Sequence, residues 1–345
     1  MVSVDLFSDT VTRPTEPMRR FMCAAEVGDE QQREDPTVNQ LQEMVADLLG
    51  KEAALFLPSG TVCNQVAFAV HCRTGVEILL QELAHPLLYE VGGPAALTGA
   101  VLRPLSGPRG QFTGQQVRAA IRPPAYYMPR TRVVSVEQTS NVSGGLCWPL
   151  DRILEVCEAA HSGGLVTHMD GARLFNAVVA TGTSARQFAA PFDSVWIDLS
   201  KGLGAPVGAV LAGSGEFIEE AWRYKQRFGG AMRQAGIIAA AGVYALRHHV
   251  DRLAEDHQRA RLLAEGLAQL PGISLDPKQV ETNIVIFDVA GTGLSGDRFA
   301  DRTLTGYGVR FSVLGPTTVR AVTHLDIPAD GISRAIEAAR AALRV

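Results

Sequence analysis

Several features that mark other classes of protein are missing from this chain. It has no long run of basic residues and a formal net charge of −4, so its composition does not favour binding to nucleic acid. No Walker phosphate-binding motif occurs, which argues against a nucleotide-binding protein. The eight histidines show no metal-ligand spacing such as H-E-x-x-H. We therefore expect neither a nucleic-acid partner nor a metal centre.

Long apolar stretches and paired cysteines are missing as well. The apolar runs are no longer than strands and are interrupted by glycine, proline or charge, so none predicts a membrane span. The first residues lack the basic and apolar regions of a secretory signal. The five cysteines are scattered, odd in number and free of any C-x-x-C motif. We expect a cytoplasmic protein with reduced thiols and no membrane partner.

The composition itself is that of a folded protein with a large core. Hydrophobic residues make up 46% of the 345 residues and charged residues 20%. A chain of this length can form one large core and a smaller one. The pattern of apolar runs predicts an N-terminal arm over residues 1–35, a large domain over 36–250 and a small C-terminal domain over 251–345.

Short apolar runs alternate with helical stretches through the first two thirds of the chain. Asp35 and Pro36 predict the start of a helix, which Gly50 would end. Continuous hydrophobicity in the runs is typical of strands buried on both faces, and so of a mainly parallel α/β sheet. The expected strands are 53–57, 77–80, 100–105, 132–136, 165–169, 194–199 and 207–212. Helices are expected from 215 to about 270, and a second strand and helix set follows.

Two polar residues follow strands at the edge where α/β sheets bind ligands. Lys201 lies between the strand at 194–199 and a glycine-rich turn, a setting that would desolvate its amine and favour an imine with a carbonyl. Asp170 closes the strand at 165–169, where a carboxylate can keep a pyridine nitrogen protonated. Arg173 could reach a phenolic oxygen on the same pyridine ring, or a substrate carboxylate. Taken singly, each of these residues also suits a structural role.

A turn and a histidine earlier in the chain supply two further features. A strand ending at Leu57 passes through Ser59, Gly60 and Thr61 into a helix, whose first N–H groups suit a dianionic phosphate. His85 follows another strand, where it could stack on a planar cofactor and exchange protons near neutral pH. Either feature alone could be structural. In this order along the chain, with the aspartate and the lysine after them, they supply what pyridoxal phosphate requires of a protein.

The chain resembles the low-specificity L-threonine aldolases, pyridoxal-phosphate enzymes of the β-eliminating lyase group. The resemblance extends through nearly the whole chain and rests on several blocks in the same order. These blocks are 8–14, 34–39, 59–61, 83–85, 170–176, 200–208, 232–236 and 320–326. It implies the aspartate-aminotransferase-like fold (fold type I), in which a large domain with a mainly parallel seven-stranded sheet carries a small α+β C-terminal domain.

The resemblance implies roles for the residues that bind the cofactor. Lys201 would hold pyridoxal phosphate covalently, Asp170 would pair with the pyridine nitrogen and His85 would stack on the ring. Gly60 and Thr61 would bind the phosphate group at the start of the helix.

Further roles concern the substrate and the assembly. Arg233 would help to bind the phosphate, while Ser8, Arg173 and Arg320 would hold the substrate carboxylate. A guanidinium suits this task because it forms two parallel hydrogen bonds with a carboxylate. The resemblance also implies a homodimer or homotetramer with active sites at subunit boundaries.

Three stretches depart from the pattern of the family. Residues 30–33 lack a tyrosine found at the active-site edge, and Phe7 stands where the family has arginine. Ser140 replaces a histidine that lies near the β-hydroxyl of the substrate. Because a serine cannot act as a base near neutral pH, we expect Ser140 only to contact the substrate. His85, or a water that it holds, is then the candidate base.

The predicted reaction is retro-aldol cleavage of a β-hydroxy-α-amino acid, of the L-threonine or L-allo-threonine type, to glycine and an aldehyde. One alternative keeps the cofactor but changes the reaction to β-elimination, racemisation, transamination or transaldolase-like exchange. A second is a cofactor-binding scaffold or sensor without catalysis, and a third is a nucleotide-binding α/β protein. Glycine released from L-threonine, L-allo-threonine or phenylserine would distinguish the aldolase from the first alternative. Cofactor absorbance that does not respond to any amino acid would favour the second, and a colourless purified protein would favour the third.

Overall fold

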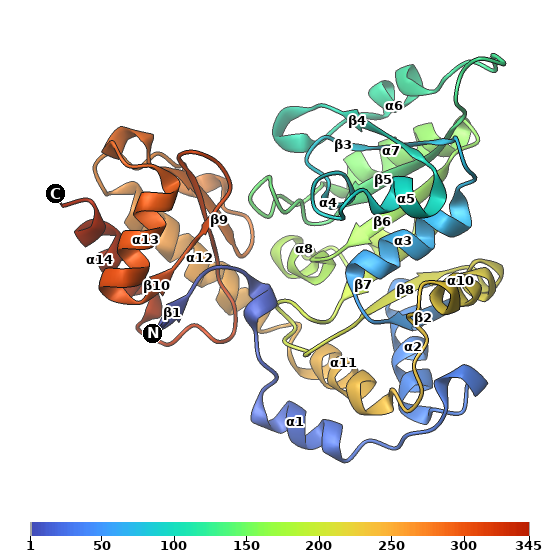
Figure 1. Cartoon of the computed structure of the whole chain (residues 1–345), viewed down its shortest axis with the longest axis horizontal. Coiled ribbons are helices and arrows are strands. Elements are labelled where there is room, and N and C mark those ends of the chain that lie inside the picture. Colours follow the sequence, from blue (N-terminus) through green and yellow to red (C-terminus); the bar gives the residue numbers. More distant parts are fainter. Residues whose placement is uncertain (1, 345) are drawn as a thin grey trace.

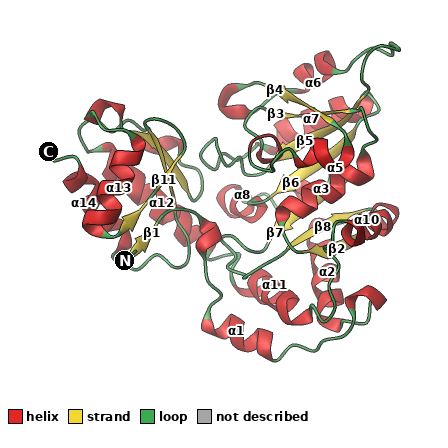
Figure 2. Ribbon diagram, in the orientation of Figure 1, coloured by secondary structure: helices red, strands yellow, loops and turns green. Residues whose placement is uncertain are grey.

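The computed structural model describes residues 2–344, which form two groups of elements around separate hydrophobic cores (Figure 1). In the larger group, helices flank a central sheet, and in the smaller group, helices lie beside short strands (Figure 2). Within the described residues, no helix is both long and apolar enough to cross a membrane.

The central sheet has seven strands in the order β2-β8-β7-β6-β5-β3-β4. Strand β8 runs antiparallel to both of its neighbours, and the other neighbouring pairs are parallel. The strands are β2 (Ala53–Leu57), β3 (Glu77–Gln81), β4 (Val101–Leu105), β5 (Thr131–Glu137), β6 (Val166–Gly171), β7 (Ser194–Asp198) and β8 (Ala209–Gly213). The prediction of a mainly parallel seven-stranded sheet is confirmed. Six strands therefore end at the same edge of the sheet.

Helices cover both faces of this sheet because alternate strand residues point to opposite sides. In β2, Ala54 and Phe56 join the core on the side of α2, while Leu55 and Leu57 join the cluster that holds α3 and α10. The helices of this group are α1 (Glu16–Cys23), α2 (Pro36–Leu49), α3 (Gly60–His71), α4 (His85–Leu88), α5 (Gly93–Thr98), α6 (Gly114–Ala120), α7 (Leu150–Ser162), α8 (Leu174–Thr181), α9 (Ala185–Ala189), α10 (Gly215–Arg227) and α11 (Gly236–His248).

Helix α2 begins and ends where the sequence predicts. The Asp35 carboxylate accepts hydrogen bonds from the backbone N–H groups of Thr37 and Val38, at 3.1 and 3.0 Å. Gly50 follows the last turn with a left-handed φ of 65°, a conformation that costs glycine little.

The smaller group is built by the two ends of the chain. It contains the strands β1 (Val4–Asp5), β9 (Ile284–Asp288), β10 (Val309–Arg310), β11 (Ser312–Val313) and β12 (Thr318–Val322), and the helices α12 (Leu253–Ala268), α13 (Gly296–Tyr307) and α14 (Gly331–Ala342). An antiparallel sheet has the order β11-β12-β9, and β1 pairs in parallel with β10. Because β1 belongs to this group, the residues that follow it cross back over the strand-end edge of the central sheet (Figure 1).

Candidate active site

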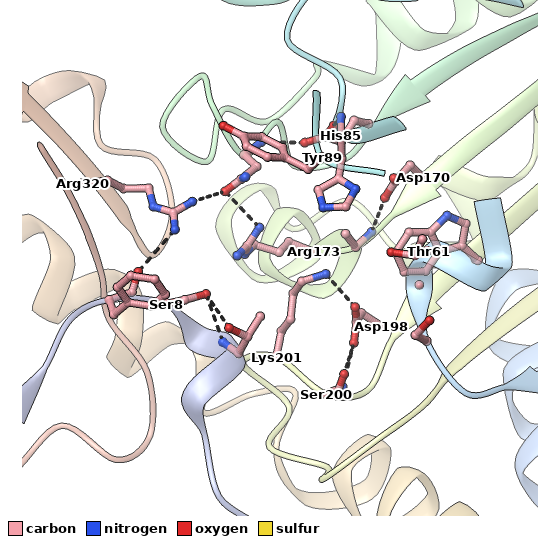
Figure 3. A pocket seen from close by; sticks show the side chains of 18 of the residues that line it. Ser8, Thr61, His85, Tyr89, Asp170, Arg173, Asp198, Ser200, Lys201 and Arg320 are labelled. Atoms are coloured by element: carbon pink, nitrogen blue, oxygen red, sulfur yellow. Dashed lines mark hydrogen bonds and ion pairs between the residues drawn. The ribbon is translucent and has the colours of Figure 1, made fainter. Parts of the chain in front are cut away.

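A cavity of about 430 Å³ lies at the carboxyl ends of the central strands, between the two groups of elements. Figure 3 shows side chains from both groups and from the N-terminal segment pointing into it. The sequence-predicted residues that line it are Ser8, Gly60, Thr61, His85, Asp170, Arg173, Lys201 and Arg320. This is the edge at which open α/β sheets bind their ligands.

Lys201 follows β7 and turns its amine into the cavity. Its Nζ lies 2.6 Å from Oδ2 of Asp198, the last residue of β7. The other Asp198 oxygen accepts hydrogen bonds from the backbone N and the hydroxyl of Ser200, at 2.7 and 2.9 Å. The Lys201 carbonyl accepts a hydrogen bond of 2.8 Å from the Thr12 hydroxyl. The turn is thus fixed on both sides, and the amine lies at the cavity, held by the Asp198 carboxylate.

Asp170 places a carboxylate at the bottom of the cavity. It is 1% exposed, its Oδ1 accepts from the backbone N of Ala172 at 3.1 Å, and its Oδ2 accepts from the Asn64 amide at 2.8 Å. Burial and the nearby Glu137 carboxylate raise the pKa of Asp170 to about 7, against the opposing effects of Asn64, His85 and Lys201. A cationic ring nitrogen facing this group would favour its ionised form.

His85 begins α4, and its imidazole points into the cavity (Figure 3). Its Nδ1 lies 2.9 Å from Oε1 of the buried Glu90, and its backbone N donates to Glu137 at 2.7 Å. Burial alone would lower the pKa of His85, but the carboxylates of Glu90, Asp170 and Glu137 outweigh it and raise that pKa. Because Nδ1 is taken by Glu90, Nε2 is the nitrogen available to a ligand.

The start of α3 forms the predicted phosphate-binding turn. The Ser59 hydroxyl accepts from the backbone N of Val62 at 3.3 Å, and Gly60 and Thr61 both line the cavity. A Cβ atom at position 60 would lie 2.2 Å from Cη2 of Trp196. Glycine is therefore required here, and the first backbone N–H groups of a twelve-residue helix stay open to an anion.

Two guanidinium groups line the cavity, Arg173 from the start of α8 and Arg320 from β12. Arg173 donates two hydrogen bonds to Asp9, at 2.8 and 2.6 Å, and this ion pair holds the pKa of the buried Asp9 far below its usual range despite desolvation. Arg320 donates to Asn141 Oδ1 at 2.9 Å and to the Phe7 carbonyl at 3.3 Å. Burial and the Arg173 cation lower the pKa of Arg320. A carboxylate would therefore be a stronger partner for Arg320 than these neutral oxygens.

Two predicted site residues do not line the cavity. Ser140 is fully buried beside it, where its hydroxyl accepts from Gln81 at 3.0 Å and donates to Ser143 at 2.8 Å. Arg233 lies on the surface, 64% exposed, and pairs with Asp29 at 2.9 Å. The neighbour of Ser140, Asn141, which lies in the turn that follows, lines the cavity instead.

Sequence reasoning missed several polar residues that shape the site, namely Asn64, Glu90, Glu137, Asn141 and Asp198. Two of them had a local signal, because Glu137 and Asp198 end strands as Asp170 does. Asn64 had none, because it lies on the buried side of α3 and reaches Asp170 only through the folding of the sheet.

The cavity has the groups that pyridoxal phosphate needs. Lys201 offers an amine for the aldehyde, Asp170 a carboxylate for the ring nitrogen and His85 an aromatic ring for stacking. The cradle at Gly60 leaves backbone N–H groups for the phosphate, and Arg320 remains for a substrate carboxylate.

Comparison with known proteins agrees with these features. Residues 5–290 match the model of the beta-eliminating lyase family. The chain is 41% identical to low-specificity L-threonine aldolase 1 of Arabidopsis thaliana, over 95% of this chain and 92% of that protein. It is also 41% identical to the low specificity L-threonine aldolase of Escherichia coli, over 94% of each chain.

Similarity of structure extends to more distant proteins. The threonine aldolase of Leishmania major superposes with a TM-score of 0.84 at 17% sequence identity, over 99% of both chains. The predicted fold, that of fold type I pyridoxal-phosphate enzymes, is confirmed. On the match over residues 5–290 and the identity to these relatives, the chain belongs to the beta-eliminating lyase family.

Proposed function

We propose that the protein is a pyridoxal-phosphate-dependent aldehyde-lyase that cleaves β-hydroxy-α-amino acids of the L-threonine type to glycine and an aldehyde. One observation supports the proposal most directly. The Lys201 amine, the buried Asp170 carboxylate and the Arg320 guanidinium all line one cavity at the strand-end edge. The relatives of similar length that are named as threonine aldolases support the same reaction.

The cofactor, when bound, supplies an electron sink for the carbanion left at Cα. Lys201 would hold it covalently, and Asp170 would keep its ring nitrogen protonated. Asp198 would keep the Lys201 side chain in position, since its carboxylate lies 2.6 Å from Nζ. The open start of α3 would bind the phosphate through Gly60 and Thr61.

Arg320 and Arg173 would orient the substrate by its carboxylate. Two hydrogen bonds of Arg173 are already taken by Asp9, so Arg320 would make the stronger contact. Ser8, which lines the cavity on the same side, would add a hydroxyl to the carboxylate site. Holding the carboxylate in one place would fix the orientation of the bonds at Cα, and orientation of this kind can lower a barrier by several kcal/mol.

His85 is the proposed base for the β-hydroxyl proton, directly or through a water. Its Nε2 faces the cavity, and Glu90 on Nδ1 stabilises the positive charge that the ring gains with the proton. Ser140 cannot take this part from its position, because its hydroxyl is buried and bonded to Gln81 and Ser143. Its neighbour Asn141, which lines the cavity, would contact the substrate instead.

The proposal includes a homo-oligomer of at least two chains. Arg233 lies on the surface of its own chain, so it could reach a phosphate only in a neighbouring copy. Apolar residues that line the cavity also stay exposed, among them Phe7 and Tyr89. The five unpaired cysteines further support a reducing, cytoplasmic compartment.

A product assay tests the proposal directly. The purified protein, loaded with pyridoxal phosphate, is given L-threonine, L-allo-threonine or phenylserine, and glycine and the aldehyde are measured. We expect both products in equal amounts, and none from Lys201→Ala. Ammonia with a keto acid, in place of glycine, would instead indicate β-elimination. No product from any of the three substrates would contradict the aldolase.

A further inference from the structure

Behind the cavity, a row of buried side chains leads from Asp170 away from the site. Asn64 donates from its Nδ2 to Asp170 Oδ2 and to Glu90 Oε1, both at 2.8 Å. Its Oδ1 is 2.7 Å from the indole Nε1 of Trp196 and 3.2 Å from His168 Nε2. One amide thus contacts both the partner of the ring nitrogen and the partner of His85.

The direction of these hydrogen bonds is fixed by the chemistry of the groups. An indole N–H can only donate, so the Asn64 atom that faces Trp196 must be the oxygen. The amide nitrogen then faces the two carboxylates, which accept. Reversal of the amide would break three of these contacts, and so Trp196 holds Asn64 in one orientation.

The same reasoning assigns the protons of the two histidines further along. Burial lowers the pKa of His168 well below its usual value and that of His71 to about 4, so both rings are neutral. His168 Nε2 must carry its proton, because it faces the Asn64 oxygen. Its bare Nδ1 then accepts from the Ser194 hydroxyl at 2.8 Å, and Ser194 accepts from His71 Nε2 at 2.7 Å.

Every donor in this row therefore points toward Asp170. His71 donates to Ser194, Ser194 to His168, His168 to Asn64, and Asn64 to the carboxylate. Aligned hydrogen bonds polarise one another in a buried setting, and each strengthens the positive end that Asn64 presents. The charged groups that face Asp170 are Glu137 from β5, His85 from α4 and Lys201 after β7.

We propose that Asn64, held by Trp196 and backed by His168, Ser194 and His71, is the positioning residue that keeps Asp170 ionised against the cofactor ring. Because the same amide nitrogen binds Glu90, it also fixes the carboxylate that orients His85. The inference rests on the proposed function for its link to catalysis. The ionisation of Asp170 in the cofactor-free chain does not depend on that function.

The decisive variant is Asn64→Leu, which keeps the branching of the side chain at Cγ and removes the amide. Gln65→Leu is the matched control, because Gln65 contacts Glu90 but not Asp170. Infrared titration of the full-length cofactor-free chain would follow the Asp170 carboxyl band, identified by its loss in Asp170→Asn. We expect Asn64→Leu to raise the pKa of Asp170 by about one unit and Gln65→Leu to leave it unchanged.

A second readout uses the cofactor labelled with ¹⁵N in its ring. Asn64→Leu should move the ring-nitrogen shift toward that of the unprotonated pyridine and weaken cofactor affinity roughly tenfold. Ser194→Ala, which lies outside the cavity, should act in the same direction with a smaller effect. If Asn64→Leu fails to fold, Ser194→Ala decides the question.

Two results would overturn the inference. One is a folded Asn64→Leu, or a folded Ser194→Ala standing in for it, whose Asp170 titrates as in the parent. The other is a shift in Gln65→Leu as large as that in Asn64→Leu. Failure of the proposed function would look different, because the infrared titration would still respond while no variant, nor the parent, bound the labelled cofactor.

Discussion

Glu90 lies 2.9 Å from Nδ1 of His85 and is one of three carboxylates that raise the pKa of that imidazole. In Glu90→Gln the imidazole keeps a hydrogen-bond partner but loses the negative charge that raises its pKa. If His85 is the base, activity increases as the pH rises through the pKa of His85, because only the unprotonated imidazole can accept a proton. We therefore expect the acidic limb of the pH–rate profile to move to lower pH in this variant, with a smaller kcat. An unchanged limb would exclude His85 as the base.

Asp9 and Arg173 form a buried ion pair whose loss should be costly. Asp9→Ala leaves the Arg173 guanidinium, 6% exposed, without its carboxylate, and uncompensated buried charges of this kind destabilise by about 3–5 kcal/mol. Urea unfolding measures this loss. The matched control is Asp5→Ala, whose pair with Arg310 is partly exposed and worth about 0–1 kcal/mol. Equal losses in both variants would contradict the account.

The same pair predicts a dependence of stability on acid. The pKa of Asp9 is lower in the folded chain than in the unfolded chain, where it is about 4. The ion pair therefore contributes fully to the free energy of unfolding at pH values above about 4. It is lost progressively as the pH falls below that value toward the folded pKa. Asp9→Asn should therefore lose less stability than the parent chain as the pH falls below about 4, as measured by thermal unfolding at each pH.

At the scale of the element, the start of α3 should be intolerant of any side chain. Gly60→Ala would place Cβ against Trp196, at a cost of about 1–3 kcal/mol for overpacking, and would cover N–H groups meant for phosphate. We expect weaker binding of pyridoxal phosphate in equilibrium titration. Gly306→Ala in α13 is the control, since nothing lies within 4 Å of its Cβ and alanine favours the helix.

The elements themselves follow closely from the sequence. Runs of apolar residues predict the seven central strands, most clearly β3, β7 and β8, whose residues are all buried. The edge strand β4 is only partly buried. The N-terminal arm is different, because β1 pairs with residues 309–310, and Val4 and Leu6 join a core whose other members lie at residue 260 and beyond. No local pattern carries information about a partner so distant.

For the site, too, residues placed by local sequence could be predicted, and residues placed by distant partners could not. Residues at or just after strand ends, such as Asp170 and Lys201, could be predicted because strand ends share one edge in a parallel sheet. Ser140 was expected to contact the substrate, yet the direction of its side chain depends on a loop whose conformation the sequence does not indicate. Glu90 and Asn64 are polar residues in otherwise buried surroundings, and their roles emerge only from their partners.

At the scale of the whole molecule, the position of Arg233 predicts an active site shared between copies. Lys201→Ala and Arg233→Ala should each be inactive or weak alone. Unfolded together and refolded as a mixture, they should regain part of the activity, because some mixed oligomers contain one site with both residues intact. Light scattering gives the oligomeric state in the same samples. A monomer, or a mixture with no regained activity, would contradict shared sites.

The account as a whole depends on a covalent link between Lys201 and the cofactor. The most direct measurement is borohydride reduction of the protein with pyridoxal phosphate, followed by mass spectrometry of its peptides. We expect the pyridoxyl group on the peptide that contains Lys201, and neither this label nor glycine production in Lys201→Ala. A label on another lysine in the active protein, or turnover by Lys201→Ala at the parent rate, would contradict the account.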